Sequence, residues 1–113
     1  MLTPLSPDLL TELEALLPKG TLREAAPRYL EEPRGKWQGV AAAVAAPKTA
    51  AEVSIIVSFA AKHHIALVPY GGGTGLVGGQ VTSTGAPLVV SLERMNHVRD
   101  VHASENVIVV EAG

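Results

Sequence analysis

Residues 65–79 read IALVPYGGGTGLVGG: a short apolar run is followed directly by six glycines among the nine positions from Gly71 to Gly79. The apolar run has the length of a buried strand and stops at a proline and a glycine cluster. Such a cluster is typical of backbone that needs positive φ angles or that another group approaches closely. A run of uncovered amides forms a concave anion site, for which pyrophosphate is a natural guest. A flexible surface loop or a hairpin turn is the alternative interpretation.

The segment before this loop predicts a strand and a helix. Residues 40–46 are apolar and end at Pro47, which favours a buried strand, although their alanines also suit a helix. Thr49 and Glu52 fit a capping box, and apolar residues then recur at helical spacing. We therefore expect a helix near residues 50–63. Strand, helix and strand together predict a parallel βαβ unit, with the glycine-rich loop after its second strand.

The N-terminal part of the chain predicts one helix and an irregular connection. Ser6 is suited to cap a short amphipathic helix that ends before residues 18–20. Residues 21–39 show no hydrophobic period, so we expect an irregular connection there. Its aromatic residues, Tyr29 and Trp37, are expected to pack it against the rest of the protein.

Two apolar runs after the loop, residues 88–92 and 106–111, predict buried strands, and residues 95–101 the start of a third. Nothing follows the last run to pair with it or to cover it. The predicted fold class is therefore α/β or α+β. We expect a small parallel or mixed sheet with flanking helices and the glycine-rich loop at its mouth.

Composition excludes several classes of protein. A length of 113 residues suits one domain or part of one. Nine Lys and Arg against 11 Asp and Glu give a net charge of -2 and no basic footprint for nucleic acid. The absence of cysteine excludes disulfide scaffolds, iron–sulfur clusters and thiol catalysis. No apolar run reaches the ~20 residues of a membrane span, and no secretion signal is recognisable, so a cytoplasmic location is expected.

Two nucleotide-binding motifs can be tested against the loop. A Walker loop needs Lys-Ser or Lys-Thr after its last glycine, but Gly79 and Gln80 follow Gly78. The dinucleotide fingerprint GxGxxG matches residues 73–78, and Glu93 mimics the acid that binds the ribose. That fingerprint must open a helix, whereas the β-branched, glycine-broken sequence that follows does not favour one. We therefore interpret the match as accidental, and a nicotinamide-binding half-domain as a minor alternative.

Side chains outside the loop show no catalytic or metal-binding pattern. The four histidines lack the spacing of metal ligands on one face of a helix or strand. The carboxylates, Glu93 and Glu111 among them, have no paired spacing and are expected on solvated faces. Trp37 is expected to be a core or interface anchor and not a ligand platform. We therefore assign no catalytic and no metal-binding residue to this chain.

Taken in order, several segments resemble the flavin-binding domain of the vanillyl-alcohol oxidase and para-cresol methylhydroxylase superfamily (PCMH-type). The resemblance is closest to the FAD-linked D-2-hydroxy-acid dehydrogenases, which act on D-2-hydroxyglutarate, D-lactate or glycolate. An ordered series of this kind is far more specific than a single glycine motif. The segments that carry it are YLEE at 29–32 with Arg34 and Gly35, PKTAAEV at 47–53, VPYGGGTGLVGG at 68–79, SLERMN at 91–96 and VEAG at 110–113.

The resemblance implies an FAD site on the glycine-rich loop. Amides at the start of the loop would hold the FAD pyrophosphate, later glycines would let the loop wrap the cofactor, and Pro47 would lie near the adenosine end. Thr74 would add a hydroxyl donor. Tyr70 stands where many relatives have arginine or glutamine, so it offers one hydrogen bond and no cation. The predicted cofactor-binding residues are Pro47, Tyr70, Gly71, Gly72, Gly73, Thr74, Gly75, Leu76, Gly78 and Gly79.

The resemblance also implies that the full-length protein oxidises a D-2-hydroxy acid to the 2-oxo acid, with hydride transfer to the flavin. Residues 1–38 would form an N-terminal helix and connection, and residues 39–113 the first lobe of the FAD-binding domain. The second lobe, the substrate domain and the catalytic base are expected beyond this chain, which would be an inactive fragment. The alternative is a non-catalytic module that oligomerises or binds a partner through its exposed C-terminal strand.

Overall fold

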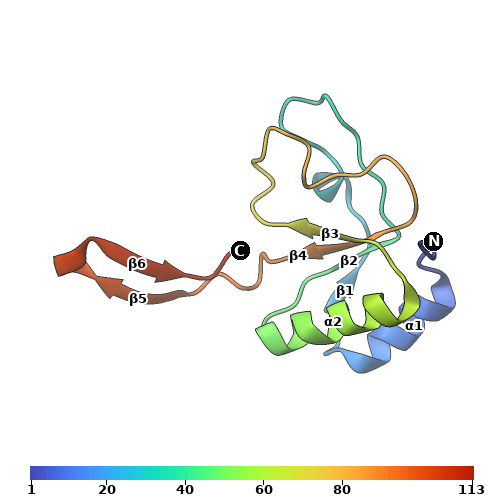
Figure 1. Cartoon of the computed structure of the whole chain (residues 1–113), viewed down its shortest axis with the longest axis horizontal. Helices are drawn as coiled ribbons and strands as arrows, with labels where there is room; N and C mark the ends of the chain where they lie inside the picture. The colour runs from blue at the N-terminus through green and yellow to red at the C-terminus, as the bar shows by residue number, and fades with distance from the viewer.

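The computed structural model describes residues 1–113 as a small α/β body from which a β-hairpin extends (Figure 1). This arrangement confirms the predicted fold class. Neither of the two α-helices has the length and apolar character needed to cross a membrane. The elements are α1 (Pro7–Leu16), β1 (Leu22–Arg23), the 3-10 turn η1 (Pro27–Tyr29), β2 (Ala43–Ala45), α2 (Ala50–His63), β3 (Leu67–Tyr70), β4 (Leu88–Ser91), β5 (Val98–His102), the 3-10 turn η2 (Ala103–Glu105) and β6 (Val107–Val110).

The body is built on a four-stranded sheet in the order β1-β2-β4-β3. Strands β2, β4 and β3 are parallel, whereas β1 is antiparallel to β2. The predicted parallel unit of β2, α2 and β3 is present, but β4 lies between its two strands. The central position suits β4 because all four of its residues are buried, as expected for a strand covered on both faces. No hydrophobic pattern predicts the two-residue β1, which is ordered by its pairing with β2.

Both helices begin where their capping residues predict. The Ser6 hydroxyl accepts a hydrogen bond from the Leu9 amide, which caps α1. The Thr49 hydroxyl accepts from the amide of Glu52 at 3.2 Å, and the Glu52 carboxylate accepts from the amide of Lys48 at 2.6 Å. Since these contacts satisfy amides that the first turn leaves free, they explain why α2 starts directly after Thr49.

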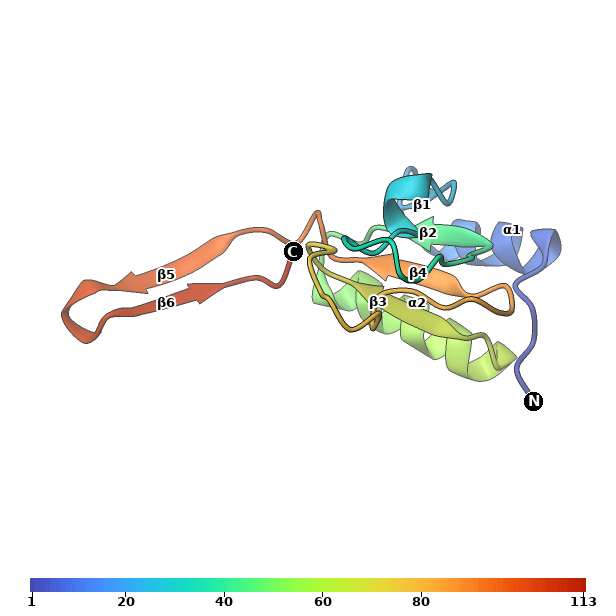
Figure 2. The ribbon, with the colours of Figure 1, turned by 90° about the horizontal axis from the view of Figure 1, so that it is seen from above.

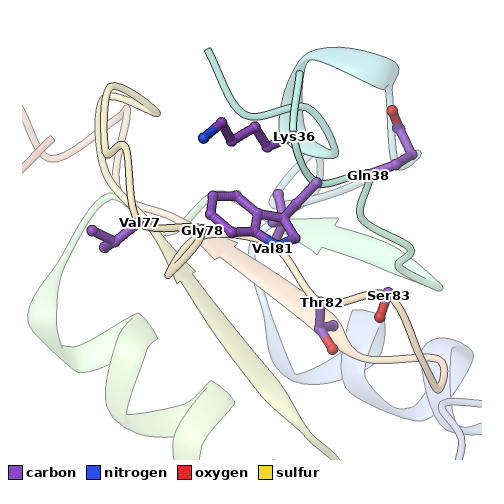
Figure 3. Close-up of a pocket in the computed structure, with 8 residues that line it drawn as sticks. Lys36, Gln38, Val77, Gly78, Val81, Thr82 and Ser83 are labelled. Carbon is purple, nitrogen blue, oxygen red and sulfur yellow. The ribbon is translucent and has the colours of Figure 1, made fainter. Parts of the chain in front are cut away.

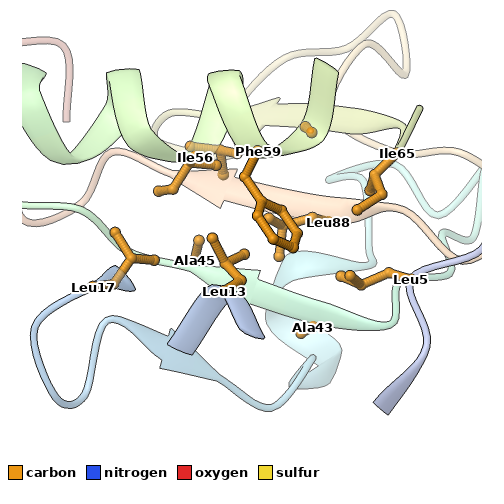
Figure 4. Packing of buried hydrophobic residues seen from close by; sticks show 11 residues of the cluster. Leu5, Leu13, Leu17, Ala43, Ala45, Ile56, Phe59, Ile65 and Leu88 are labelled. Carbon is orange, nitrogen blue, oxygen red and sulfur yellow. The ribbon is translucent and has the colours of Figure 1, made fainter. Parts of the chain in front are cut away.

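Each face of the sheet has its own core because strand side chains alternate between the two sides. On one face α1 and α2 pack against alternate residues of β2 and β4 (Figure 4). On the other face the connection between β1 and β2 folds over the sheet, where Tyr29 packs with Val44, Val68 and Val89. The N-terminal segment therefore contributes to both cores. The core on the helical side consists of Leu5, Leu13, Leu17, Ala43, Ala45, Ile56, Phe59, Ala60, Ile65, Leu88 and Val90.

Strands β5 and β6 form an antiparallel hairpin that projects away from the body (Figure 2). The expectation that the final strand is unpaired is wrong, because β6 pairs with the strand that precedes it. The expectation that it is buried is also wrong, because every residue of both strands is exposed. Asn106, with a φ of 54°, turns the chain back so that the hydrogen bonds of β6 are satisfied locally.

Glu111 fastens the base of this hairpin. Its carboxylate accepts hydrogen bonds from the backbone amide of His97 at 3.0 Å, from the His97 ring at 2.8 Å and from Arg99 at 3.0 Å. These donors, the backbone amide foremost, lower the pKa of Glu111 from 4.5 to about 2. The side chain of Glu111 is only 11% exposed, so the expectation that it lies on a solvated face is wrong.

The helical core gives a test with a matched control on neighbouring residues of α2. Ile56 is fully buried against the sheet, whereas Ile55 is 37% exposed. Ile56→Ala should lower the free energy of unfolding by about 2–5 kcal/mol, because it removes apolar contacts and leaves a cavity. Ile55→Ala should change it by about 0.5 kcal/mol or less. Urea unfolding followed by circular dichroism measures both, and equal losses would contradict the packing described here.

Candidate functional site

The glycine-rich loop, residues 71–80, begins at the carboxyl end of β3. Pro47 and Glu93 each follow a neighbouring parallel strand by two residues, Pro47 after β2 and Glu93 after β4. Open α/β sheets bind their ligands at this carboxyl edge. No helix follows the loop before β4, so the reading of residues 73–78 as a dinucleotide fingerprint is excluded, as we predicted.

The backbone amides of residues 71–80 donate no hydrogen bond within the protein. The loop is held instead through its carbonyl groups. The carbonyl of Leu76 accepts from the guanidinium of Arg34, and that of Gly78 accepts from the amide of Val81. Polar backbone groups in native proteins normally find partners. Ten consecutive amides without a protein partner therefore form a ready set of donors for an anion.

The buried side chain of Gln80 is hydrogen-bonded to two carbonyl groups of the loop. Its amide nitrogen donates to the carbonyls of Gly75 at 2.9 Å and Gly73 at 3.5 Å. Sequence reasoning missed this role, because a glutamine after a glycine run has no characteristic spacing. The contact again uses loop carbonyls and leaves the loop amides free.

Two of the six loop glycines are required by their geometry. Gly73 has a φ of 70°, and a Cβ atom there would lie 2.1 Å from the hydroxyl oxygen of Tyr70. Gly78 has a φ of 75°, and its Cβ atom would lie 3.1 Å from a ring carbon of Trp37. Positive φ angles and close contacts of this kind favour glycine over any other residue. At Gly72, by contrast, a Cβ atom would meet nothing within 4 Å.

Tyr70 is tied to the connection and not to the loop amides. Its hydroxyl donates to the carbonyl of Arg28 at 2.9 Å, and its ring meets the Tyr29 ring edge-on, with 5.4 Å between the centroids. Its one donor proton is therefore engaged within the protein. A phosphate contact by Tyr70 stays a prediction that would require this bond to open. The hydroxyl of Thr74 lies on the exposed part of the loop and has no partner in the chain.

An open cavity of about 550 Å³ lies beside the loop, between the connection and residues 77–83 (Figure 3). Trp37 lines it and is 46% exposed, so of the two predicted roles, core anchor or interface anchor, the first is wrong and the second stays a prediction. Its indole ring instead lies against Gly78, whose lack of a side chain leaves room for it. Tyr29, the other aromatic of the connection, is buried as predicted, at 2% exposure.

Glu93 connects three residues of the N-terminal segment to the end of β4. Its carboxylate accepts from Tyr29 at 2.6 Å, from Arg23 at 2.7 Å and from Arg28 at 3.0 Å. Partial burial raises the pKa of Glu93, but hydrogen bonds from Tyr29 and Arg28 and the charges of both arginines outweigh it, so the net shift is downward. The side chain of Glu93 is 27% exposed and is bound by three residues from elsewhere in the chain, so the expectation of a freely solvated carboxylate is wrong here too.

The sequence model of the FAD binding domain family matches residues 41–113, well over half of the chain. The chain belongs to this family of FAD-binding domains. FAD is therefore its cofactor, as predicted. The matched range contains the glycine-rich loop, Pro47 and Glu93, and so the whole carboxyl edge of the sheet.

Curated relatives include D-2-hydroxyglutarate dehydrogenase of Xanthomonas citri pv. viticola, 41% identical over 78 residues, which are 69% of this chain and 16% of that protein. The protein named mitochondrial D-2-hydroxyglutarate dehydrogenase in Bos taurus is 32% identical over 112 residues, 96% of this chain and 20% of that protein. A glycolate oxidase subunit of Bacillus subtilis is 29% identical over 85 residues, 75% and 18% of the two chains. The chain thus spans about a fifth of the length of these relatives.

Solved structures with the same fold include an alkyldihydroxyacetonephosphate synthase, at a TM-score of 0.74 and 21% identity over 97% of this chain and 25% of that one. A 4-ethylphenol oxidase from Gulosibacter chungangensis gives a TM-score of 0.71 and 22% identity, over 94% of this chain and 22% of that one. These likenesses support the fold and, with the family match, confirm the predicted resemblance.

The two kinds of glycine in the loop give a paired test. Gly73→Ala should lower the free energy of unfolding by about 1–2 kcal/mol, because alanine is strained at positive φ and its methyl group meets Tyr70. Gly72→Ala should change it by less than about 1 kcal/mol, because the space around Gly72 is open. Urea unfolding of the two variants measures the difference. A Gly73→Ala variant as stable as Gly72→Ala would contradict the loop geometry.

Proposed function

We propose that this chain holds the ADP half of FAD in a flavin-dependent enzyme that oxidises a D-2-hydroxy acid to the 2-oxo acid. The observation that carries the proposal is the row of ten unbonded amides at the carboxyl edge of the sheet, in a chain of the FAD-binding-domain family. The substrate class is supported by relatives named for D-2-hydroxyglutarate, glycolate and, in fission yeast, D-lactate.

The loop fits a diphosphate by charge and by access. It contains no acidic side chain, and most of its residues are exposed, so negative phosphate oxygens meet amide dipoles and no carboxylate. Amides of Gly71, Gly72, Gly73 and Thr74 would donate to the diphosphate, with the Thr74 hydroxyl as a further donor. Because the loop carbonyls are bonded to the protein, the amides can point to the ligand without breaking contacts.

Bound FAD would supply the acceptor for the hydride that leaves the α-carbon of the substrate. The hydroxyl proton must go to a base at the same time, and we place that base outside this chain. The roles proposed for this chain are to hold the cofactor and to orient it. Pro47, buried at the end of β2, would contribute the wall near the adenosine. A cytoplasmic location stays a prediction, because the relatives include proteins named as mitochondrial.

The projecting hairpin favours a second candidate, a module that associates through this surface. Val101 and Ile108 face each other across the two strands, and they are 61% and 58% exposed. Exposed apolar patches of this kind commonly mark interaction sites. This candidate is the predicted module that oligomerises or binds a partner through its C-terminal segment. The exposed element is, however, a paired hairpin and not a lone strand.

Self-association can be tested by light scattering with two matched variants. If the hairpin mediates it, the wild-type chain should show about twice its mass of 11.7 kDa at high concentration. Ile108→Lys should restore the monomer, whereas Ile55→Lys, on the exposed side of α2, should not. A wild-type monomer at every concentration would contradict this second candidate.

Cofactor binding can be tested by titrating the ¹⁵N-labelled chain with ADP, FAD and riboflavin. ADP and FAD should shift the amide signals of residues 71–80, with dissociation constants above about 1 μM, because a single lobe offers only part of a preorganised site. Riboflavin is the control, because it lacks the diphosphate and should leave these signals unchanged. Shifts confined to other residues, or none with FAD, would contradict the proposed function. Submicromolar binding would contradict the need for a further lobe.

A further inference from the structure

The glycine-rich loop needs support from outside, because its own sequence favours many conformations. That support comes from the connection between β1 and β2, which lies beside the loop (Figure 1). Tyr70 directly precedes the loop, and its hydroxyl donates to the carbonyl of Arg28 in the connection. In the middle of the loop, the carbonyl of Leu76 accepts from the guanidinium of Arg34. Each contact uses a carbonyl group and leaves the loop amides free.

The connection itself has little regular structure to hold it. Between β1 and β2 it contains the three-residue turn η1 and one isolated antiparallel bridge, between Glu31 and Gln38. A charged attachment to the sheet comes from Glu93, two residues beyond β4. Its carboxylate accepts hydrogen bonds from Tyr29, from Arg28 and from Arg23 of β1. Both carboxylate oxygens are engaged, one by Arg23 and Tyr29 and the other by Arg28. Glu93 is therefore committed to protein partners and not to a ribose.

We propose that Glu93 is a positioning residue for the cofactor loop. By holding Arg28 and Tyr29 it fixes the connection on the sheet. The Arg28 carbonyl then fixes the Tyr70 hydroxyl, against which Gly73 of the loop lies. The inference rests on the proposed function for the ligand, a diphosphate, but the ordering of the loop can be observed without any ligand.

Charge-assisted hydrogen bonds to Glu93 can order the connection, and through it the glycine-rich loop, before a ligand binds. A hydrogen bond that involves a charged group is about twice as strong as a neutral one, and Glu93 accepts from two guanidinium groups. A loop that is already ordered loses less conformational entropy when a ligand binds. Removal of the Glu93 charge should therefore weaken binding although Glu93 does not touch the ligand.

The test compares Glu93→Gln with the wild-type chain and with Glu12→Gln. Glu12 is the control because its carboxylate also contacts basic side chains, Lys62 and His63, on the helical face of the body. Two quantities are measured: ¹⁵N order parameters of residues 71–80 without ligand, and the dissociation constant for ADP. In Glu93→Gln the order parameters should fall from about 0.85 to below about 0.6. ADP should bind about tenfold more weakly, and Glu12→Gln should leave both quantities unchanged.

Tyr70→Phe is a second variant that keeps the inference testable if Glu93→Gln does not fold. It removes only the hydroxyl that bonds to Arg28 and retains the ring beside Gly73. It should lower the same order parameters and weaken ADP binding by about threefold, the smaller effect of one neutral hydrogen bond. Circular dichroism verifies that each variant is folded.

The outcomes separate this inference from the proposed function. Loop order parameters that stay unchanged in folded Glu93→Gln, or in Tyr70→Phe if Glu93→Gln is unfolded, would overturn the positioning role. Weaker ADP binding with an unchanged loop would also overturn it, because Glu93 would then act on the ligand directly. If the loop loosens but no variant, the wild type included, binds ADP, the positioning role stands and the proposed function fails.

Discussion

The candidate site depends on which backbone groups of the glycine-rich loop are hydrogen-bonded within the protein and which are left free. The loop is fastened through carbonyls, to Arg34 at Leu76, to Gln80 at Gly73 and Gly75, and to neighbouring backbone. Its amides are left without protein partners. If the amides were hydrogen-bonded within the protein, they could not donate to an anion. The direction of these few hydrogen bonds therefore leaves the loop amides available for the diphosphate that we propose as their ligand.

The sheet and the connection supply what such a loop cannot supply for itself. Parallel strands bring the ends of β2, β3 and β4 to one edge, which places the loop beside Pro47 and Glu93. Glycine at positions 73 and 78 admits the rings of Tyr70 and Trp37 against the backbone. Apolar cores pack against both faces of the sheet that carries this edge.

In the hairpin of β5 and β6 the backbone groups are bonded, and the apolar side chains are the groups left exposed. The base of the hairpin is held by Glu111. Two strands alone bury too little surface to be stable, so a hairpin of this kind normally packs against another surface. The chain spans about a fifth of the length of its curated relatives. The exposed apolar hairpin therefore lies at the opposite end of the chain from the core-packed body, and it is the surface on which the second candidate function depends.

The sequence by itself determined the local features: the start of each helix at Ser6 and Thr49, the strand before the loop, the glycine-rich loop without a following helix, and the family. The helix starts, the strand and the loop follow from capping, periodicity and glycine content, which act over a few residues, whereas the family follows from the resemblance of an ordered series of segments. Only the tertiary structure decided that β4 lies between β2 and β3, that β6 pairs with β5, and that Glu93 meets Arg23, Arg28 and Tyr29. Such contacts join residues up to 70 positions apart, and no local pattern encodes them. The exposure of Trp37 and the burial of Gln80 were decided in the same way, because burial depends on what the rest of the chain places around a side chain.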